Sequence, residues 1–184
     1  MLGGVRPAAA QYFGIRLSPH DFSPPEAAAD GVIDFGEMCA FCHAPPGSEE
    51  AGPPTRTDAP RRYRRYSSST ADMPERGTLS PVSMACLSCH DGTVATGVHL
   101  DGFANLGADL RDDHPISVVY DPEVDPALRS GDDVVAAGLK LFREGGAQTV
   151  ECATCHNPHD PNTARPFLRV SNEGSGLCLT CHIK

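Results

Sequence analysis

The sequence predicts a fold of mostly irregular coil with short α-helices and minimal β-structure. The chain contains 18 glycines and 17 prolines in 184 residues, and both residue types interrupt regular structure. It has no tryptophan and only 6% aromatic residues, so a core built from side chains alone would be thin. The third observation is a short cysteine motif that recurs along the chain and uses all 8 cysteines.

This motif is Cys-x-x-Cys-His, and it occurs four times. It is the attachment signal of c-type haem, in which the two thiols form thioethers to the porphyrin and the histidine binds the iron as its proximal ligand. The sequence therefore predicts four haem c groups. The thioether cysteines are Cys39, Cys42, Cys86, Cys89, Cys152, Cys155, Cys178 and Cys181, and the proximal histidines are His43, His90, His156 and His182.

Two other chemistries use paired cysteines at this spacing. Two Cys-x-x-Cys units can form a four-cysteine zinc site, and each unit can close a disulfide. Neither chemistry requires a histidine directly after each pair, and the chain has only 8 histidines. The recurring fifth residue thus favours haem over a zinc site or redox-active thiols.

The histidines outside the motifs equal the motifs in number. A single histidine is more often a surface or hydrogen-bonding residue than a ligand. As a set, however, they match the four distal positions that six-coordinate irons would need. Met73 is a minor alternative for one position, where a methionine would raise the potential of the haem. The four candidate distal ligands are His20, His99, His114 and His159.

His159 follows the proximal His156 by three residues. It cannot reach the opposite face of the iron that His156 binds. If His159 is a ligand, it therefore binds a different haem and holds two haems close together. Short separations between haems favour fast electron hopping.

Regular elements are expected at few places along the chain. Residues 44–60, rich in proline, glycine and acidic residues, predict a loop. The basic cluster 61–66 could pair with haem propionates or with an acidic partner, or form a plain solvated loop. Residues 116–120 predict a short strand, and residues 132–144 predict a helix that ends at a pair of glycines. Each attachment motif is expected on a turn or two of helix.

The chain is expected to form a single domain over residues 1–184, wrapped around a stack of four haems that supply most of the core. Residues 121–133 are a possible joint between a front pair of haems (1–120) and a back pair (132–184). Only 22 residues separate Cys155 from Cys178, so the last two haems should be neighbours. The haem at His182 is expected near the molecular surface.

Charge and composition also bear on partners and location. The formal net charge is −9, which argues against nucleic acid as a partner. The sequence has no apolar run long enough for a transmembrane segment. Haem attachment outside the cytoplasm predicts an exported protein. Because residues 1–11 lack the apolar stretch of a signal peptide, the sequence is expected to be a mature, truncated or mis-started form.

Beyond its motifs, the chain resembles the doubled-CxxCH multihaem cytochromes, and within them the OmcE-like tetrahaem cytochromes that polymerise into extracellular filaments. The resemblance rests on the segments 19–23 (PHDFS), 66–70 (YSSST), 89–95 (CHDGTVA), 105–110 (NLGADL), 113–117 (DHPIS) and 155–159 (CHNPH). It implies that His20, His114 and His159 are distal ligands. The family often has a histidine three residues after the first motif, but here Ala44, Pro45 and Pro46 follow His43. His99 is the available substitute.

The expected function is electron transfer without substrate chemistry, because irons with two histidine ligands have no open position. The resemblance implies a repeating subunit of a conductive filament at the cell surface or outside the cell, with His20 binding a haem of the adjacent subunit. Its partners would be copies of itself, other multihaem cytochromes or extracellular electron acceptors. The alternatives are a soluble periplasmic tetrahaem shuttle and, less favoured, a small multihaem reductase.

Overall fold

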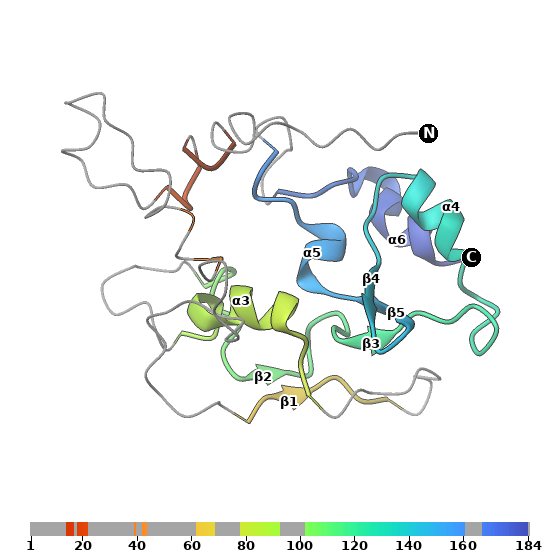
Figure 1. Cartoon of the computed structure of the whole chain (residues 1–184), viewed down its shortest axis with the longest axis horizontal. Coiled ribbons are helices and arrows are strands. Elements are labelled where there is room, and N and C mark those ends of the chain that lie inside the picture. The colour runs from red at the N-terminus through yellow and green to blue at the C-terminus, as the bar shows by residue number, and fades with distance from the viewer. Residues whose placement is uncertain are drawn as a thin grey trace.

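Short elements joined by coil make up the fold (Figure 1). The computed structural model describes residues 14–16, 18–21, 39, 42–43, 62–68, 78–92, 102–160 and 167–183. The elements are β1 (Arg64–Arg65), α3 (Pro81–His90), β2 (Asp109–Leu110), β3 (Val118–Val119), α4 (Gly131–Ala136), β4 (Phe142–Glu144), β5 (Ala147–Val150), α5 (Cys152–Cys155), a 3-10 turn (Glu173–Ser175) and α6 (Gly176–Cys181). Among the described residues, no helix is long and apolar enough to cross a membrane. The predicted loop at 44–60, Met73 and His99 lie outside this description.

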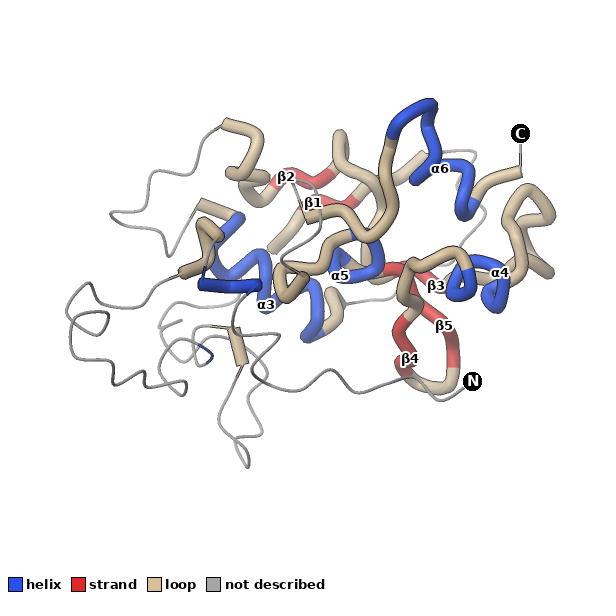
Figure 2. Tube along the Cα trace, turned by 90° about the horizontal axis from the view of Figure 1, so that it is seen from above, coloured by secondary structure: helices blue, strands red, loops and turns tan. Residues whose placement is uncertain are grey.

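Two small sheets support the helices. In the larger sheet β5 lies between β3 and β4, and both pairings are antiparallel. The smaller sheet joins β1 and β2 in parallel, with Arg64 opposite Asp109. Figures 1 and 2 both show α3, α5 and α6 following one another along the long axis of the molecule. The chain therefore sets three of its four attachment motifs in a row.

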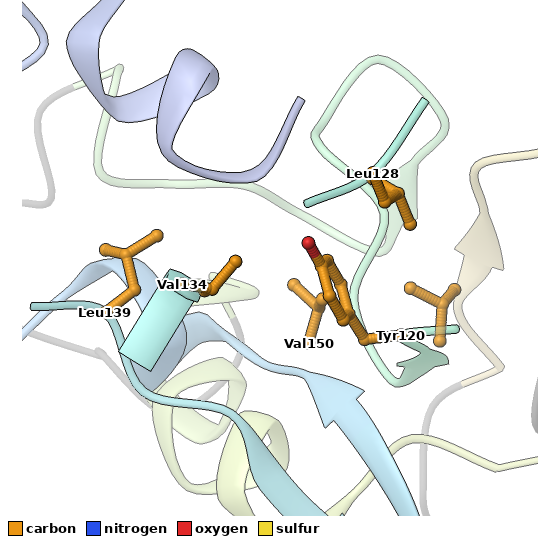
Figure 3. Close-up of a cluster of buried hydrophobic side chains, with 6 residues drawn as sticks. Tyr120, Leu128, Val134, Leu139 and Val150 are labelled. Atoms are coloured by element: carbon orange, nitrogen blue, oxygen red, sulfur yellow. The ribbon is translucent and has the colours of Figure 1, made fainter. Parts of the chain in front are cut away.

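Apolar side chains form a core between the larger sheet and the helices α4 and α6 (Figure 3). Its buried members are Val118, Tyr120, Leu128, Val134, Leu139 and Val150. Tyr120 also directs its hydroxyl to the carbonyl of Arg129, at 2.8 Å. Burying one valine or leucine side chain stabilises a protein by about 1.5–3 kcal/mol. The described residues thus have an apolar core of their own, which the expectation of a core made mainly of haems did not include.

The predicted helix over 132–144 is correct only in its first half. Helix α4 begins after Ser130, whose side chain accepts a hydrogen bond from the backbone N–H of Asp133, and it ends at Ala136. Gly138 then has a φ of 106°, a conformation that side-chain-bearing residues rarely adopt. Beyond it the chain extends into β4, where Phe142 lies opposite Thr149. Pairing with β5 therefore replaces the second half of the expected helix.

The predicted strand over 116–120 is confirmed at its centre, in β3. The ladder bonds extend beyond that element, because the N–H of Ser117 donates to Val150 at 2.7 Å and that of Tyr120 to Gln148 at 2.8 Å. Ser117 itself has a φ of 54°, which ends the regular strand on that side.

Helical turns at the attachment motifs are confirmed for the second, third and fourth motifs, in α3, α5 and α6. Helix α3 begins with Pro81 at its first position, and the side chain of Ser80 accepts a hydrogen bond from Val82 at 3.1 Å, as expected for a helix start. The first motif is described at Cys39, Cys42 and His43, where the N–H of His43 donates to the carbonyl of Cys39 at 2.8 Å.

Candidate functional site

Helices α3 and α5 pack against each other and bring together the first cysteines of the second and third motifs. Hydrogen bonding to the Cys152 thiol, together with burial, raises the pKa of Cys86. The two thiols therefore lie close together. The attachment points of a haem bonded to Cys86 and a haem bonded to Cys152 would therefore be adjacent.

A buried polar network fixes this helix pair. Both Ser83 in α3 and Ser117 donate to the Oε2 atom of Glu151, at 2.6 Å and 2.9 Å. Ser83 in turn accepts the N–H of Cys152 at 3.2 Å, and the N–H of Glu151 donates to Thr154 at 2.9 Å. Glu151 is only 1% exposed. One carboxyl side chain thus ties the start of α5 to α3.

Cysteines of the other consecutive motifs are also close together in space. Burial and the nearby Cys89 thiol raise the pKa of Cys42, which places the first motif beside the second. Burial and the nearby Cys181 thiol raise the pKa of Cys155 to about 11, which places the third motif beside the fourth. The thiols of these consecutive motifs therefore lie close enough to influence each other's pKa.

Three pairs of histidines lie ring to ring. Each pair combines one attachment-motif histidine with one histidine from outside the motifs. The ring centroids are 6.0 Å apart for His20 and His90, 5.9 Å for His43 and His159, and 6.5 Å for His114 and His182. These six residues come from segments far apart in the sequence, so their pairing is a property of the fold.

These separations fit an iron held between two imidazoles. An imidazole nitrogen binds a transition metal at about 2 Å. Two rings on opposite faces of one iron therefore have centres roughly 6–6.5 Å apart, once the distance from nitrogen to ring centre is added on each side. The tilt of 38° to 61° between the ring planes does not prevent both nitrogens from pointing to one metal.

The hydrogen bonds of the histidines agree with this geometry. The Nδ1 atom of His90 lies 2.7 Å from the carbonyl oxygen of Ala104, and that of His114 lies 3.0 Å from the carbonyl of Pro115. Nδ1 bonding of this kind orients a ring and leaves Nε2 for the metal. Burial lowers the pKa of His20 and of His159, which favours the neutral imidazole that metals bind.

The structure describes two of the expected ligands in less detail. His156 ends α5, where it forms a β-bridge with Leu168, and His99 lies outside the described residues. The fold also gives two histidine rings neighbours that the sequence did not predict. Phe167 lies 5.4 Å from the ring of His20, and the carbonyl of Ala104 supports His90. A backbone acceptor has no sequence signal, so only the fold reveals it.

The basic cluster forms bonds within the chain. Arg64 lies 3.4 Å from Asp109 in an exposed ion pair, and the Nη2 group of Arg65 donates to the carbonyl of Ser117 at 3.2 Å. The hydroxyl of Tyr63 donates to Asp91 at 2.7 Å. This last bond joins Tyr63 to the residue directly after His90, so Tyr63 is the member of the cluster that contacts the second motif.

Comparison with known proteins gives one finding. Residues 145–184, which contain the third and fourth motifs, match the family described as the doubled CXXCH motif. No curated protein matches the chain. A doubled motif of this kind implies covalently bound haem c. Residues 145–184 thus carry the haem-attachment unit of multihaem c-type cytochromes, the proteins that use such haems for electron transfer.

Proposed function

We propose that the protein conducts electrons through four haem c groups, each held by two histidines. The observation that carries this proposal is the set of three ring pairs, each with one motif histidine and one other. Histidines that only form hydrogen bonds at the surface do not need to lie in such pairs. Haem supplies the iron that alternates between the ferric and ferrous states.

From these pairs we propose the distal ligands of three haems. His20 serves the haem of the second motif, His159 that of the first and His114 that of the fourth. By count, His99 then serves the haem of the third motif, carried by His156. The assignment of His99 rests on the sequence, because that residue lies outside the described part of the chain.

Two histidine ligands close each iron to substrate and favour a low-spin haem of fairly low potential. A reductase needs at least one open iron position, with acid–base groups around it. The close ring pairs therefore favour a conductor over an enzyme. The neighbouring thiols of successive motifs support the same reading, because haems attached to neighbouring cysteines would lie close together.

We further propose that the protein is the repeating subunit of an extracellular filament. At one end of the motif series Cys39, Cys42 and His43 are exposed. At the other end Cys178 is exposed, and Ile183 has 51% of its surface accessible. Head-to-tail contact between these two ends would bring a haem of one copy against a haem of the next.

His20 was expected to bind a haem of the adjacent subunit, but its ring lies beside His90 of its own chain. We therefore propose that copies meet through exposed haem edges, with no ligand from His20 crossing the interface. The expectation of a filament does not depend on that ligand.

Spectra of the purified protein test the conductor proposal. Intact-mass measurement should give four covalent haems, and ferric spectra should contain only low-spin signals. Carbon monoxide should not bind to the reduced protein. A high-spin ferric signal, or rapid binding of carbon monoxide, would instead indicate an open iron and the reductase alternative.

Electron microscopy tests the filament proposal separately. Material recovered from the outside of expressing cells should contain filaments in which haems of successive copies are in contact. Discrete particles at high concentration, recovered from the periplasm, would indicate the soluble shuttle while leaving the conductor proposal intact.

A further inference from the structure

Arg169 contacts the third attachment motif at two points. Its backbone N–H donates to the carbonyl of Cys155 at 2.8 Å, and its side-chain Nε donates to the carbonyl of Ala153 at 3.0 Å. The preceding residue, Leu168, forms an antiparallel β-bridge with His156. A Leu-Arg pair thus binds the backbone of this motif at three of its five residues.

A second Leu-Arg pair makes the same contacts with the fourth motif. The backbone N–H of Arg129 donates to Cys181 at 2.8 Å, and its Nε donates to Leu179 at 2.8 Å. Leu128 forms an antiparallel β-bridge with His182. Leu179 holds the same position in its motif as Ala153 does in the third. Position for position, the three contacts are identical.

The two pairs reach their motifs from opposite directions in the sequence. Leu168 follows His156, whereas Leu128 precedes His182 by a long stretch that includes the third motif. Simple duplication of a contiguous segment does not explain this arrangement. The same local geometry has been built twice from different parts of the chain.

The geometry fixes the backbone at the proximal histidine. Helices α5 and α6 both end at the second cysteine of their motif, and the next residue is extended in each case. His156 has φ −103° and ψ 140°, and His182 has φ −95° and ψ 139°. A β-bridge at the histidine explains why the helix stops there and why the two conformations agree.

The second motif is held in a different way. His90 lies inside helix α3, its carbonyl accepts the N–H of Leu106 at 2.8 Å, and its ring contacts Ala104. No arginine makes these bonds. The Leu-Arg contacts are therefore not a necessary feature of a Cys-x-x-Cys-His turn, and they distinguish the third and fourth motifs from the second.

Each arginine also brings a positive charge to its motif. The Nε groups are used by backbone carbonyls, and among the described residues neither guanidinium forms an ion pair with a carboxylate. Burial lowers the pKa of the Arg169 guanidinium, and Asp160 lies close enough to raise it against that lowering, so the arginine keeps its positive charge. A cation close to a haem favours the ferrous state, because the ferric state carries one more positive charge.

We propose that Leu128-Arg129 and Leu168-Arg169 are two copies of one positioning device, which fixes the proximal histidine of a haem-attachment motif and raises the potential of the haem that the motif carries. Arg129 and Arg169 are positioning residues in this scheme. The inference rests on the proposed function only in requiring haems at the third and fourth motifs.

Four variants of the haem-loaded protein test it: Arg129→Gln, Arg169→Gln, Arg129→Lys and Arg169→Lys. Arg64→Gln is the matched control, because it removes the same charge from an exposed arginine that is paired with Asp109. Spectroelectrochemical titration reports the four reduction steps. Electron paramagnetic resonance of the ferric protein reports the orientation of the histidine rings.

Each glutamine variant should move one reduction step to lower potential, a different step for each arginine, and the double variant should show both shifts. Each lysine variant keeps the charge but loses the Nε bond. It should restore most of the potential while the resonance signal of that haem stays altered. The Arg64→Gln control should change neither measurement.

Unchanged potentials in both glutamine variants would overturn the proposal, as would shifts no larger than those of Arg64→Gln. A shift of the same step by both variants would refute the equivalence of the two pairs. Arg129 is exposed, so its variants remain informative if those of Arg169 fold poorly. Intact-mass measurement distinguishes failure of the proposed function from failure of this inference. Haems missing at these motifs would refute the proposed function. Variants that carry all their haems and show unchanged potentials would refute this inference alone.

Discussion

The ring of His159 lies 5.9 Å from the ring of His43, centroid to centroid, although the chain places His159 three residues after His156. The motif that carries His156 is thereby linked to His43 of the first motif through a few backbone atoms. That His159 serves a haem other than that of its own motif stays a prediction, and the pairing with His43 supports it.

Replacing His159 with methionine tests that assignment. A methionine ligand raises the potential of a haem relative to histidine, so His159→Met should raise one reduction step. Nuclear magnetic resonance should show contacts from the methionine methyl group to the haem bonded to Cys39 and Cys42. Contacts to the haem bonded to Cys152 and Cys155 would contradict the pairing. His114→Met is the control, and it should raise a different step.

Truncating Glu151 should destabilise the junction of α3 and α5. Glu151→Ala leaves the buried hydroxyls of Ser83 and Ser117 without their acceptor, and unsatisfied buried groups of this kind cost about 1–3 kcal/mol each. Glu151→Gln keeps an oxygen that accepts both bonds, so it should cost much less. Urea unfolding of the haem-loaded protein measures the difference. Equal losses in the two variants would show that the hydrogen bonds do not hold the junction.

Two adjacent valines in α4 give a matched test of the apolar core. Val134 is fully buried, whereas Val135 is 50% exposed. Val134→Ala removes two buried methyl groups and should lower the free energy of unfolding by about 1.5–3 kcal/mol. Val135→Ala should change it by no more than about 0.5 kcal/mol. Similar losses would mean that the haems, and not this cluster, dominate the packing around α4.

Gly138 ends α4 in a conformation that favours glycine. At its φ of 106° an added Cβ would meet only Val170, at an ordinary 3.6 Å, so the cost of Gly138→Ala comes from the backbone. That cost should be about 1–3 kcal/mol, measured by thermal or urea unfolding. Gly102→Ala is the control, because a Cβ there meets nothing within 4 Å and its φ is not in the unfavourable range. Stability unchanged in Gly138→Ala would place the end of α4 elsewhere.

Local chemistry explains which parts of the fold the sequence could predict. The helical turns at the second, third and fourth motifs and the centre of the strand at 116–120 follow from short-range patterns, and the structure confirms them. The helix over 132–144 did not persist to its predicted end. Its second half pairs with β5 across the turn at Gly145 and Gly146. A local sequence pattern does not predict the strand with which a segment pairs.

The sequence by itself determined the attachment chemistry, because the spacing of two thiols and a histidine is a property of five consecutive residues. It also determined the number of other histidines available to the irons. Only the tertiary structure decided which histidines meet, such as His20 with His90, and which backbone segments hold a motif, such as Leu168-Arg169. Those relationships join residues far apart in the chain, and they exist only after packing has brought the segments together.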